Sequence, residues 1–254
     1  MKAFKLLFSM IVLAAMSAGF VSCDDDDNGW ESDNGGYYYP NALVTCKVAP
    51  DNTFFLQVDD TTTWVPENIT KSPYGNKEVR ALVNATILDV TPMPGYTKTV
   101  RVNAMDSIRT KNTVPSLGER NDEVYGNDMV DVVRDWVNVA EDGYLTLRFR
   151  TTFSVGTTHY INLLTGVNPD DPYEVELRHN ANGDMHGNFY GDALVAFNLK
   201  DLPDTEGKTV KMKLRIYYGS GVKNTIEFDY CTRKASGNTD LFLDGAANSL
   251  RPII

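Results

Sequence analysis

Two histidines and a carboxylate, the side chains of His179, Asp184 and His186, lie close together in a predicted loop. Imidazole and carboxylate groups bind zinc, but a zinc site needs three or four ligands that converge on the metal. The stretch from His179 to His186 does not have the ligand spacing of a known zinc site. It therefore favours a polar hairpin tip, and the sequence predicts no metal site and no cofactor.

Acidic residues offer a second route to chemistry. Residues 168–172 (NPDDP) present several oxygens that calcium could use, but they lack an EF-hand register and a closing bidentate glutamate, so we interpret them as a solvated turn. Glycosidases need two carboxylates across a cleft. With 34 acidic residues, pairs at a suitable distance arise by chance. The chain has no phosphate-binding loop, no nucleophile elbow and no zinc helix motif, so we predict no catalytic residues.

Two tryptophans are candidates for ligand binding or for packing. Trp64 is near the tip of a predicted strand, where its ring could stack on a sugar or another flat ligand. The competing interpretation, favoured by the pattern, is that Trp64 packs over the end of a small β-barrel. Trp136 lies in a segment rich in valine, and we expect it in the core of a second domain.

The N-terminus has the three parts of an export signal. Lys2 and Lys5 give it positive charge, and residues 6–16 (LLFSMIVLAAM) form an uncharged, mostly apolar run. Residues 20–23 (FVSC) resemble a bacterial lipobox, although Phe20 stands where leucine is usual. We therefore predict a signal peptide at residues 1–22, with Cys23 as the lipidation site that anchors the protein to a membrane. A retained signal anchor and simple secretion with a free Cys23 thiol are the alternatives.

Residues 23–40 form an acidic, glycine-containing segment that we interpret as a flexible tether. Cleavage at Cys23 would leave 254 − 22 = 232 residues, and loss of Lys2 and Lys5 would change the net charge from −10 to −12. Six of these negative charges precede Pro40, with no basic residue among them. Binding to a nucleic-acid backbone needs clustered basic residues, so the sequence argues against a nucleic-acid partner.

Almost every periodic segment after the tether alternates with period 2, which predicts an all-β protein. We expect a small OB-like barrel over residues 41–113, a linker over 114–128 and an antiparallel β-sandwich over 129–254. Residues 129–140 match both helix and strand spacing, and their valines favour a strand. The predicted strands cover residues 42–49, 53–58, 62–65, 78–90, 97–108, 144–153, 159–164, 174–178, 193–199, 210–218 and 225–231.

Two cysteines remain besides Cys23. Alternation places Cys46 on a buried strand face and Cys231 on a polar one, which argues against a disulfide between them. An exported protein nevertheless permits such a bridge, so the pairing stays open.

The whole layout resembles the NigD-like lipoproteins of Bacteroidetes, which pair an N-terminal OB-type domain with a C-terminal β-sandwich. The resemblance covers nearly the whole chain and depends mainly on the stretch VRDWVNVAEDGYLTLRF, residues 133–149. The family is named after a bacteriocin-associated operon and has no assigned molecular function. No catalytic residues can be carried over from it.

The resemblance also implies two kinds of processing. Acidic residues after the lipidated cysteine direct lipoproteins of that phylum to the cell surface, and Asp24, Asp25, Asp26 and Asp27 resemble such a signal. We therefore expect lipid anchoring at the outer membrane with surface exposure. The stretches Asp60-Thr61-Thr62 and Asp106-Ser107-Ile108 resemble O-glycosylation motifs, so Thr61 and Ser107 are candidate glycan sites.

Together these patterns favour a non-catalytic, lipid-anchored binding protein, with a bacteriocin or a host glycan among the candidate ligands. The alternative is a hydrolase that acts on an extracellular glycan, or an accessory protein that binds one. Protein and glycan partners both remain open at this stage.

Overall fold

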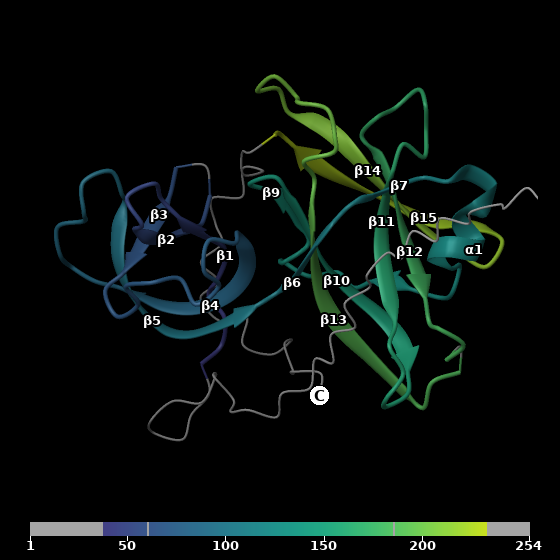
Figure 1. The fold of residues 1–254 in the computed structure, drawn as a ribbon, viewed down its shortest axis with the longest axis horizontal. Helices are drawn as coiled ribbons and strands as arrows, with labels where there is room; N and C mark the ends of the chain where they lie inside the picture. Colours follow the sequence, from purple (N-terminus) through teal and green to yellow (C-terminus); the bar gives the residue numbers. More distant parts are fainter. Residues whose placement is uncertain (1–37, 60, 185, 233–254) are drawn as a thin grey trace, which may run out of the picture.

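The period-2 segments form β-structure throughout the part of the chain that the computed structural model describes, residues 38–59, 61–184 and 186–232. The structure is all-β apart from one short 3-10 turn and one short helix, as predicted, and it has two domains (Figure 1). The predicted signal peptide and most of the predicted tether lie outside the described residues.

The first domain is a closed barrel with the strand order β1-β2-β3-β5-β4. Its interior holds the buried side chains that the alternation predicted, among them Val44, Leu56 and Val83. β3 and β5 pair in parallel and the other neighbours are antiparallel. The strands are β1 (Ala42–Val48), β2 (Phe54–Gln57), β3 (Thr63–Pro66), β4 (Val79–Ile87) and β5 (Lys98–Ser107).

The second domain is a sandwich of two sheets with one shared apolar core. The first sheet contains β6 (Arg109–Asn112), β13 (Phe189–Asn198), β10 (Tyr144–Phe153), β8 (Asp131–Val132) and β9 (Val139–Glu141). The second sheet contains β15 (Gly221–Tyr230), β14 (Val210–Tyr218), β12 (Glu174–Asn180), β11 (Tyr160–Thr165) and β7 (Val114–Pro115). Leu145 and Leu147 of β10 face Leu177 and Leu214 across the core.

The chain enters the second domain earlier than the sequence indicated. Only Ile108 separates the end of β5 from the start of β6, and β6 pairs in parallel with β13 of the sandwich. The expected barrel boundary at residue 113 therefore lies too late by one strand. Residues 114–128 do not act as a linker either, because they form β7, the 3-10 turn η1 (Gly118–Arg120) and helix α1 (Asn121–Tyr125), which contacts β11 and β12.

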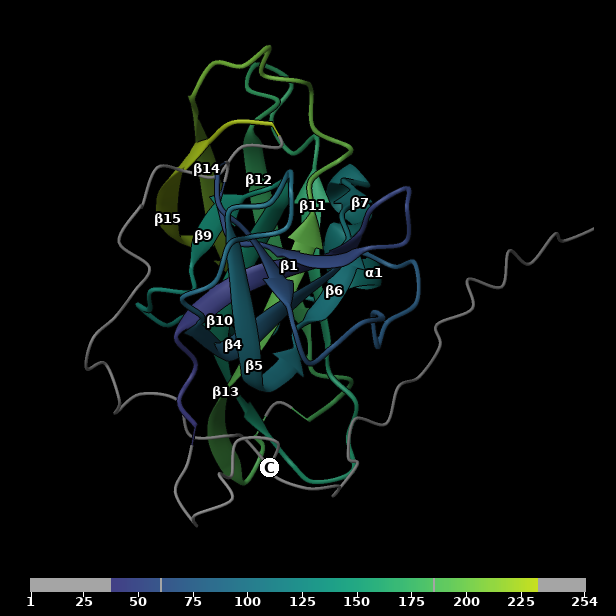
Figure 2. The same cartoon turned by 90° about the vertical axis from the view of Figure 1, so that its left-hand side faces the viewer.

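The two domains share a buried interface, and in Figure 2 the barrel stands in front of the sandwich. Its apolar part joins barrel side chains with side chains of the first sheet: Leu43, Leu82, Ile108, Val137, Val139 and Ala196. Arg80 of β4 is fully buried there and forms an ion pair with Glu141. It also donates to Thr45 Oγ1 at 2.9 Å and to Thr146 Oγ1 at 3.4 Å.

Because the guanidinium is satisfied from both domains, the interface fixes the barrel on the sandwich. A second ion pair, Lys47 Nζ to Asp142 Oδ1 at 2.8 Å, and a hydrogen bond from Tyr144 Oη to Glu78 Oε2 at 3.1 Å lie beside it. Tyr144 and Thr146 lie on the face of β10 opposite Leu145 and Leu147, and they are buried because the barrel covers them.

Residues 129–140 form two short strands instead of the one expected. Asp135 and Asn138 interrupt the segment, because their side chains take backbone hydrogen bonds that a continuous strand would use. Trp136 was predicted to lie in the sandwich core. It packs instead against the interface cluster, so that prediction is wrong.

Candidate functional site

The barrel carries a group of exposed apolar side chains on the loop between β4 and β5, at the left end of Figure 1. Ile87, Val90 and Met93 are 44%, 54% and 45% exposed. Tyr96, near the end of the loop, contacts Phe55 on the outer face of β2, with ring centroids 5.4 Å apart. We call these five residues the barrel-end patch.

The loop is held in place by uncharged groups. Thr97 at its end and Thr63 on β3 bond through both backbone and hydroxyl groups, with Thr63 N donating to Thr97 Oγ1 at 2.8 Å and Thr97 N donating to Thr63 O at 3.1 Å. Gly95 adopts φ +89°, which other residues rarely tolerate, and Pro92 and Pro94 fix their own φ angles. The patch is therefore preorganised.

Trp64 is not part of this surface. Its side chain is fully buried in the barrel core, so the prediction that it could stack on a ligand is wrong and the packing interpretation holds. β3 is short, and its alternation turns Trp64 inward beside Leu56 of β2. The aromatic contact on this side of the barrel is formed by Phe55 and Tyr96, both half-buried, and the strand pattern did not predict it. An aromatic residue directly after a Pro-x-Pro-Gly turn was the available signal for Tyr96.

His179 and Asp184 of the candidate zinc motif lie at one end of the sandwich, where they meet His159. His159 Nδ1 is 3.0 Å from His179 Nε2, and His159 Nε2 is 3.2 Å from Asp184 Oδ2. His179 Nδ1 donates to the backbone oxygen of Met129 at 2.8 Å, and Asp184 Oδ1 accepts from Ser154 Oγ at 2.8 Å. We call this chain of contacts the histidine network.

The network does not have the geometry of a metal site. His186, the second histidine of the candidate motif, is exposed and is replaced in the network by His159 from another loop. The three ligand groups follow one another in a chain and do not face one point. Across the described residues, no three His, Cys, Asp or Glu side chains are grouped to hold a metal ion.

The hydrogen bonds define where the protons are. Because Nδ1 of His179 donates to a carbonyl, its Nε2 accepts, and the proton between the two rings belongs to His159. His159 Nε2 in turn faces the carboxylate of Asp184. Burial lowers the pKa of His179, which keeps this ring neutral. Burial raises the pKa of Asp184, but hydrogen bonds from Ser154 and His159 outweigh it and hold the pKa below its ordinary value.

The network ties together two loops, and exposed apolar side chains lie in the first loop and on the strand ends beside both. Residues 154–159 join β10 to β11, and residues 181–188 join β12 to β13. Phe153 contacts Phe189, with ring centroids 5.7 Å apart, and the guanidinium of Arg150 lies over Tyr190. The sandwich-tip patch consists of five residues: Phe153, Val155, Tyr160, Phe189 and Tyr190.

The calcium candidate is a turn, in agreement with the prediction. Asp171 accepts from Lys213 Nζ at 2.9 Å and from the backbone N–H of Tyr173 at 3.1 Å. Asn168 donates to Glu174 Oε2 at 3.1 Å. The Asp171 carboxylate and the Asn168 amide are thus used in bonds that shape the turn.

The two cysteines are free and buried, and they do not form a disulfide. Cys46 lies in the barrel core, as alternation predicted, and burial raises its pKa to about 12. Cys231 is buried as well, against the expectation of a polar face, because Thr205 covers it with its hydroxyl 3.5 Å from Sγ.

The modification sites stay predictions. Thr61 and Ser107 are both exposed, and Thr61 Oγ1 donates to Asp59 Oδ1 at 3.0 Å. Cys23 and Asp24–Asp27 lie outside the described residues. Within the part of the chain that is described, no helix has the length and apolar character needed to cross a membrane.

Comparison with known proteins bears on the whole fold. Residues 43–108 match the family model of the NigD-like N-terminal OB domain, and residues 112–230 match that of the NigD-like C-terminal beta sandwich domain. The chain belongs to the NigD-like family. The two matches agree with the barrel and the sandwich, and the gap between them contains most of β6. The resemblance inferred from the sequence is thereby confirmed.

Three solved structures of similar fold come from species of Parabacteroides and Bacteroides. One, from Parabacteroides distasonis and described as a toxin-related protein, is 34% identical, covers 75% of this chain and 92% of its own, and has a TM-score of 0.60. A protein of unknown function from Bacteroides vulgatus is 22% identical over 74% of this chain and 89% of its own, with a TM-score of 0.61.

A NigD-like immunity protein from Bacteroides caccae is also 22% identical, over 76% of this chain and 93% of its own, with a TM-score of 0.50. At this identity the last two likenesses establish the fold alone. No curated protein matches the chain.

Proposed function

We propose that this member of the NigD-like family is a non-catalytic, lipid-anchored binding protein of the outer membrane, displayed at the cell surface. Its barrel-end patch would bind a protein partner. The observation that carries the proposal is this patch of exposed apolar side chains on a loop held rigid by Thr63 and Thr97. Contiguous exposed apolar surface marks interaction sites, and a preorganised loop loses little entropy on binding.

The chemistry of the patch favours a protein over a glycan. Val90 and Met93 supply aliphatic and thioether surface, which suits protein partners, and methionine adapts to irregular apolar surfaces. The glycan interpretation depended on Trp64 as a stacking ring, and that ring is buried. The description of the Parabacteroides distasonis structure as toxin-related is in keeping with a protein ligand.

A binding role also agrees with how the ionisable groups are used. The acid and base groups of the histidine network bond to one another and to the backbone. Arg80 and Glu141 fill the junction between the domains, where a two-domain hydrolase would keep a cleft. These arrangements favour structural roles for groups that a glycan hydrolase would need for catalysis.

The anchor is tested through Cys23. The mature protein should float with membranes and carry radiolabelled palmitate, and a Cys23→Ala variant should lose both properties. Protease treatment of intact cells should remove the anchored protein if it is displayed outside. Full protection in intact cells, with digestion after lysis, would refute surface display and leave the anchor standing.

The binding surface is tested by charge substitution. Val90→Asp and Met93→Asp should abolish recovery of the partner by the lipid-anchored protein after crosslinking in living cells. Val222→Asp is the matched control, since Val222 is 41% exposed and lies on β15 of the other domain. Equal recovery by all three variants would rule out the barrel-end patch as the binding surface.

A further inference from the structure

The sandwich-tip patch is the second exposed apolar surface, and the proposed function does not use it. Val155, in the loop of residues 154–159, is 83% exposed. Phe189 and Tyr190, at the start of β13, are 52% and 59% exposed. Tyr160, the first residue of β11, is 39% exposed. Four apolar side chains thus stand in solvent at one end of the second domain.

The tip is rigid, so the exposure of these side chains is built into the fold. Asp184 links the loop of residues 181–188 to Ser154 and His159 of the neighbouring loop. Gly187 brings the chain so close to β10 that a Cβ there would lie 2.3 Å from backbone atoms of Phe153. These contacts therefore hold the two loops against each other at the end of the sandwich where the patch residues lie.

The charge of the tip differs from that of the rest of the chain. Residues 151–160 (TTFSVGTTHY) contain no acidic residue, lysine or arginine, and residues 181–191 contain only Asp184, which faces His159. Arg150 and Asp192 beside the patch form an ion pair with each other. In a chain with a net charge of −10, an uncharged end can approach an anionic lipid surface without the repulsion that the acidic faces would meet.

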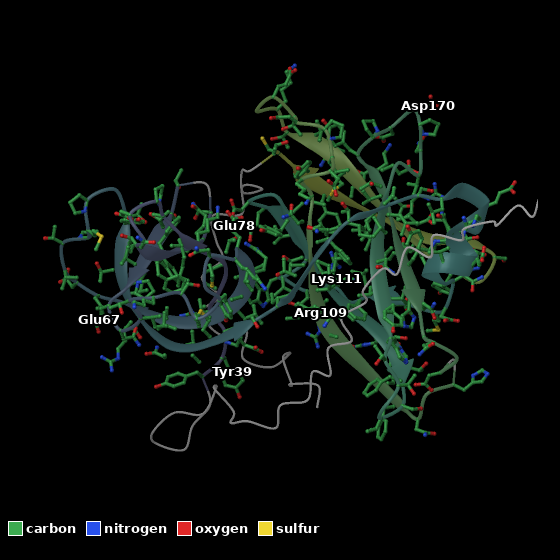
Figure 3. All side chains as sticks on the ribbon, in the orientation of Figure 1. Tyr39, Glu67, Glu78, Arg109, Lys111 and Asp170 are labelled. Atoms are coloured by element: carbon green, nitrogen blue, oxygen red, sulfur yellow. The ribbon has the colours of Figure 1, made fainter. Side chains whose placement is uncertain are left out.

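The first described residues and the sandwich tip lie at the same end of the molecule. Tyr39, next to the first described residue, is labelled at the lower edge of the molecule in Figure 3, whereas Asp170 is labelled at the upper edge. The end of β10 and the start of β13 also lie at the lower end in Figures 1 and 2. The acidic 168–172 turn thus points away from the end at which the proposed tether enters.

The geometry points to the sandwich tip as a surface that contacts the lipid bilayer, with Val155 and the aromatic rings at the boundary between headgroups and acyl chains. Tyrosine and phenylalanine favour that boundary, and small apolar insertions add to the binding of a covalent anchor. The inference rests on the proposed lipid anchor at Cys23. Residues 23–37 can extend over about 50 Å, which is enough for the anchor and the tip to reach the same membrane.

The test uses tryptophan fluorescence in the full mature lipoprotein, reconstituted into phosphatidylethanolamine–phosphatidylglycerol vesicles. Val155→Trp places the fluorophore at the tip, and Asp170→Trp is the control because residue 170 is exposed at the opposite end. Lipids brominated on the acyl chain quench only tryptophans that reach them. Both variants keep the three native tryptophans, so the wild-type protein supplies the background.

We expect brominated lipid to quench the added fluorescence of Val155→Trp and to leave that of Asp170→Trp unchanged. Equal quenching at both positions, or none at either position in protein that floats with the vesicles, would overturn the inference while the anchor survives. A protein adduct at residue 155 after photocrosslinking in cells would also overturn it, because the tip would then face a protein. Failure to float would instead refute the anchor itself, and the inference with it.

Discussion

The barrel-end patch and the sandwich-tip patch expose similar side chains, but different bonds hold them in place. Backbone and hydroxyl bonds of Thr63 and Thr97 hold the barrel loop, and neither group titrates near neutral pH. The sandwich tip depends on contacts among His159, His179 and Asp184, and the environment lowers the pKa of both His179 and Asp184. Similar apolar surfaces can therefore have different sensitivities to their surroundings, because sensitivity resides in the bonds beneath the surface.

The two patches also point in different directions. The barrel loop lies at the left end of Figure 1, whereas the tip shares the lower end with the start of the described chain. A protein held with its tip on a membrane would direct the barrel-end patch sideways, where a partner can reach it. That division of roles requires the two domains to keep a fixed relative orientation.

The largest expected effect comes from removing the ion pair that fixes the orientation of the two domains. Arg80→Ala leaves Glu141 buried without its partner, a loss that costs about 3–5 kcal/mol of unfolding free energy. Burial already raises the pKa of Glu141 against the opposing charge of Arg80, so this carboxylate depends on the pair. Urea unfolding of the full chain measures the change.

Arg101→Ala is the matched control, because the Arg101–Glu67 pair is exposed and contributes only about 0–1 kcal/mol. If both variants lose the same small amount of unfolding free energy, the interface does not fix the two patches relative to each other.

Gly187→Ala should disturb the tip alone. The added methyl group would overlap backbone atoms of Phe153, and overpacking of this kind costs about 1–3 kcal/mol. Gly221→Ala is the control, since nothing lies within 4 Å of its Cβ position and its φ is not positive. Thermal unfolding measures stability, and hydrogen exchange shows which loop opens. Faster exchange in the barrel loop would contradict the separation of the two regions.

Acid should loosen the tip and leave the barrel loop unchanged. Burial lowers the pKa of His179, so the unfolded chain binds a proton more readily, and stability from this group is lost as the pH falls below about 6.5. Asp184, whose pKa is also lowered, adds a second loss below about pH 4. The groups that face them are His159, Asp128, the Met129 carbonyl and Ser154.

Hydrogen exchange at pH 7 and pH 5, corrected for the intrinsic pH dependence of exchange, measures this difference. His179→Gln removes the titrating ring and should abolish the acid response of the tip between these values. An equal acid response in residues 88–96 would show that the barrel loop is as sensitive to acid as the sandwich tip, which would contradict the prediction.

The smallest effects are expected at the exposed side chains themselves. Val90→Ser and Val155→Ser should each change the unfolding free energy by no more than about 0.5 kcal/mol, because neither residue is buried. Loss of partner recovery in one variant and of bilayer contact in the other, at unchanged stability, would separate the two patches. A loss of stability beyond that range would mean that the residue serves the fold.

The sequence predicted most accurately the strands that bury one face and expose the other. The bounds of β10 and β14 agree with the predicted 144–153 and 210–218, because strict alternation marks both their faces and their ends. β6 was missed because Arg109–Asn112 contains no apolar residue that would show a period. The prediction for β13 began four residues too late, since Phe189 and Tyr190 follow a turn-like Gly187-Asn188 pair and are exposed.

The candidate surfaces were harder to predict than the fold. Alternation identifies what is buried within one domain, but it does not show which strand face another domain covers, and so it could not predict the burial of Tyr144 and Thr146. The same limit applies to His159 and His179, which are 20 residues apart in sequence and meet only because β11 and β12 pair.

The sequence by itself determined the all-β class, the two domain types and their order, since local alternation and turn residues depend only on neighbours along the chain. Tertiary structure alone decided that Trp64 is core, that Cys231 is covered, and that Arg80 joins the domains. It also decided which apolar residues remain in solvent. Those outcomes depend on contacts between residues far apart in sequence, and no local pattern records them.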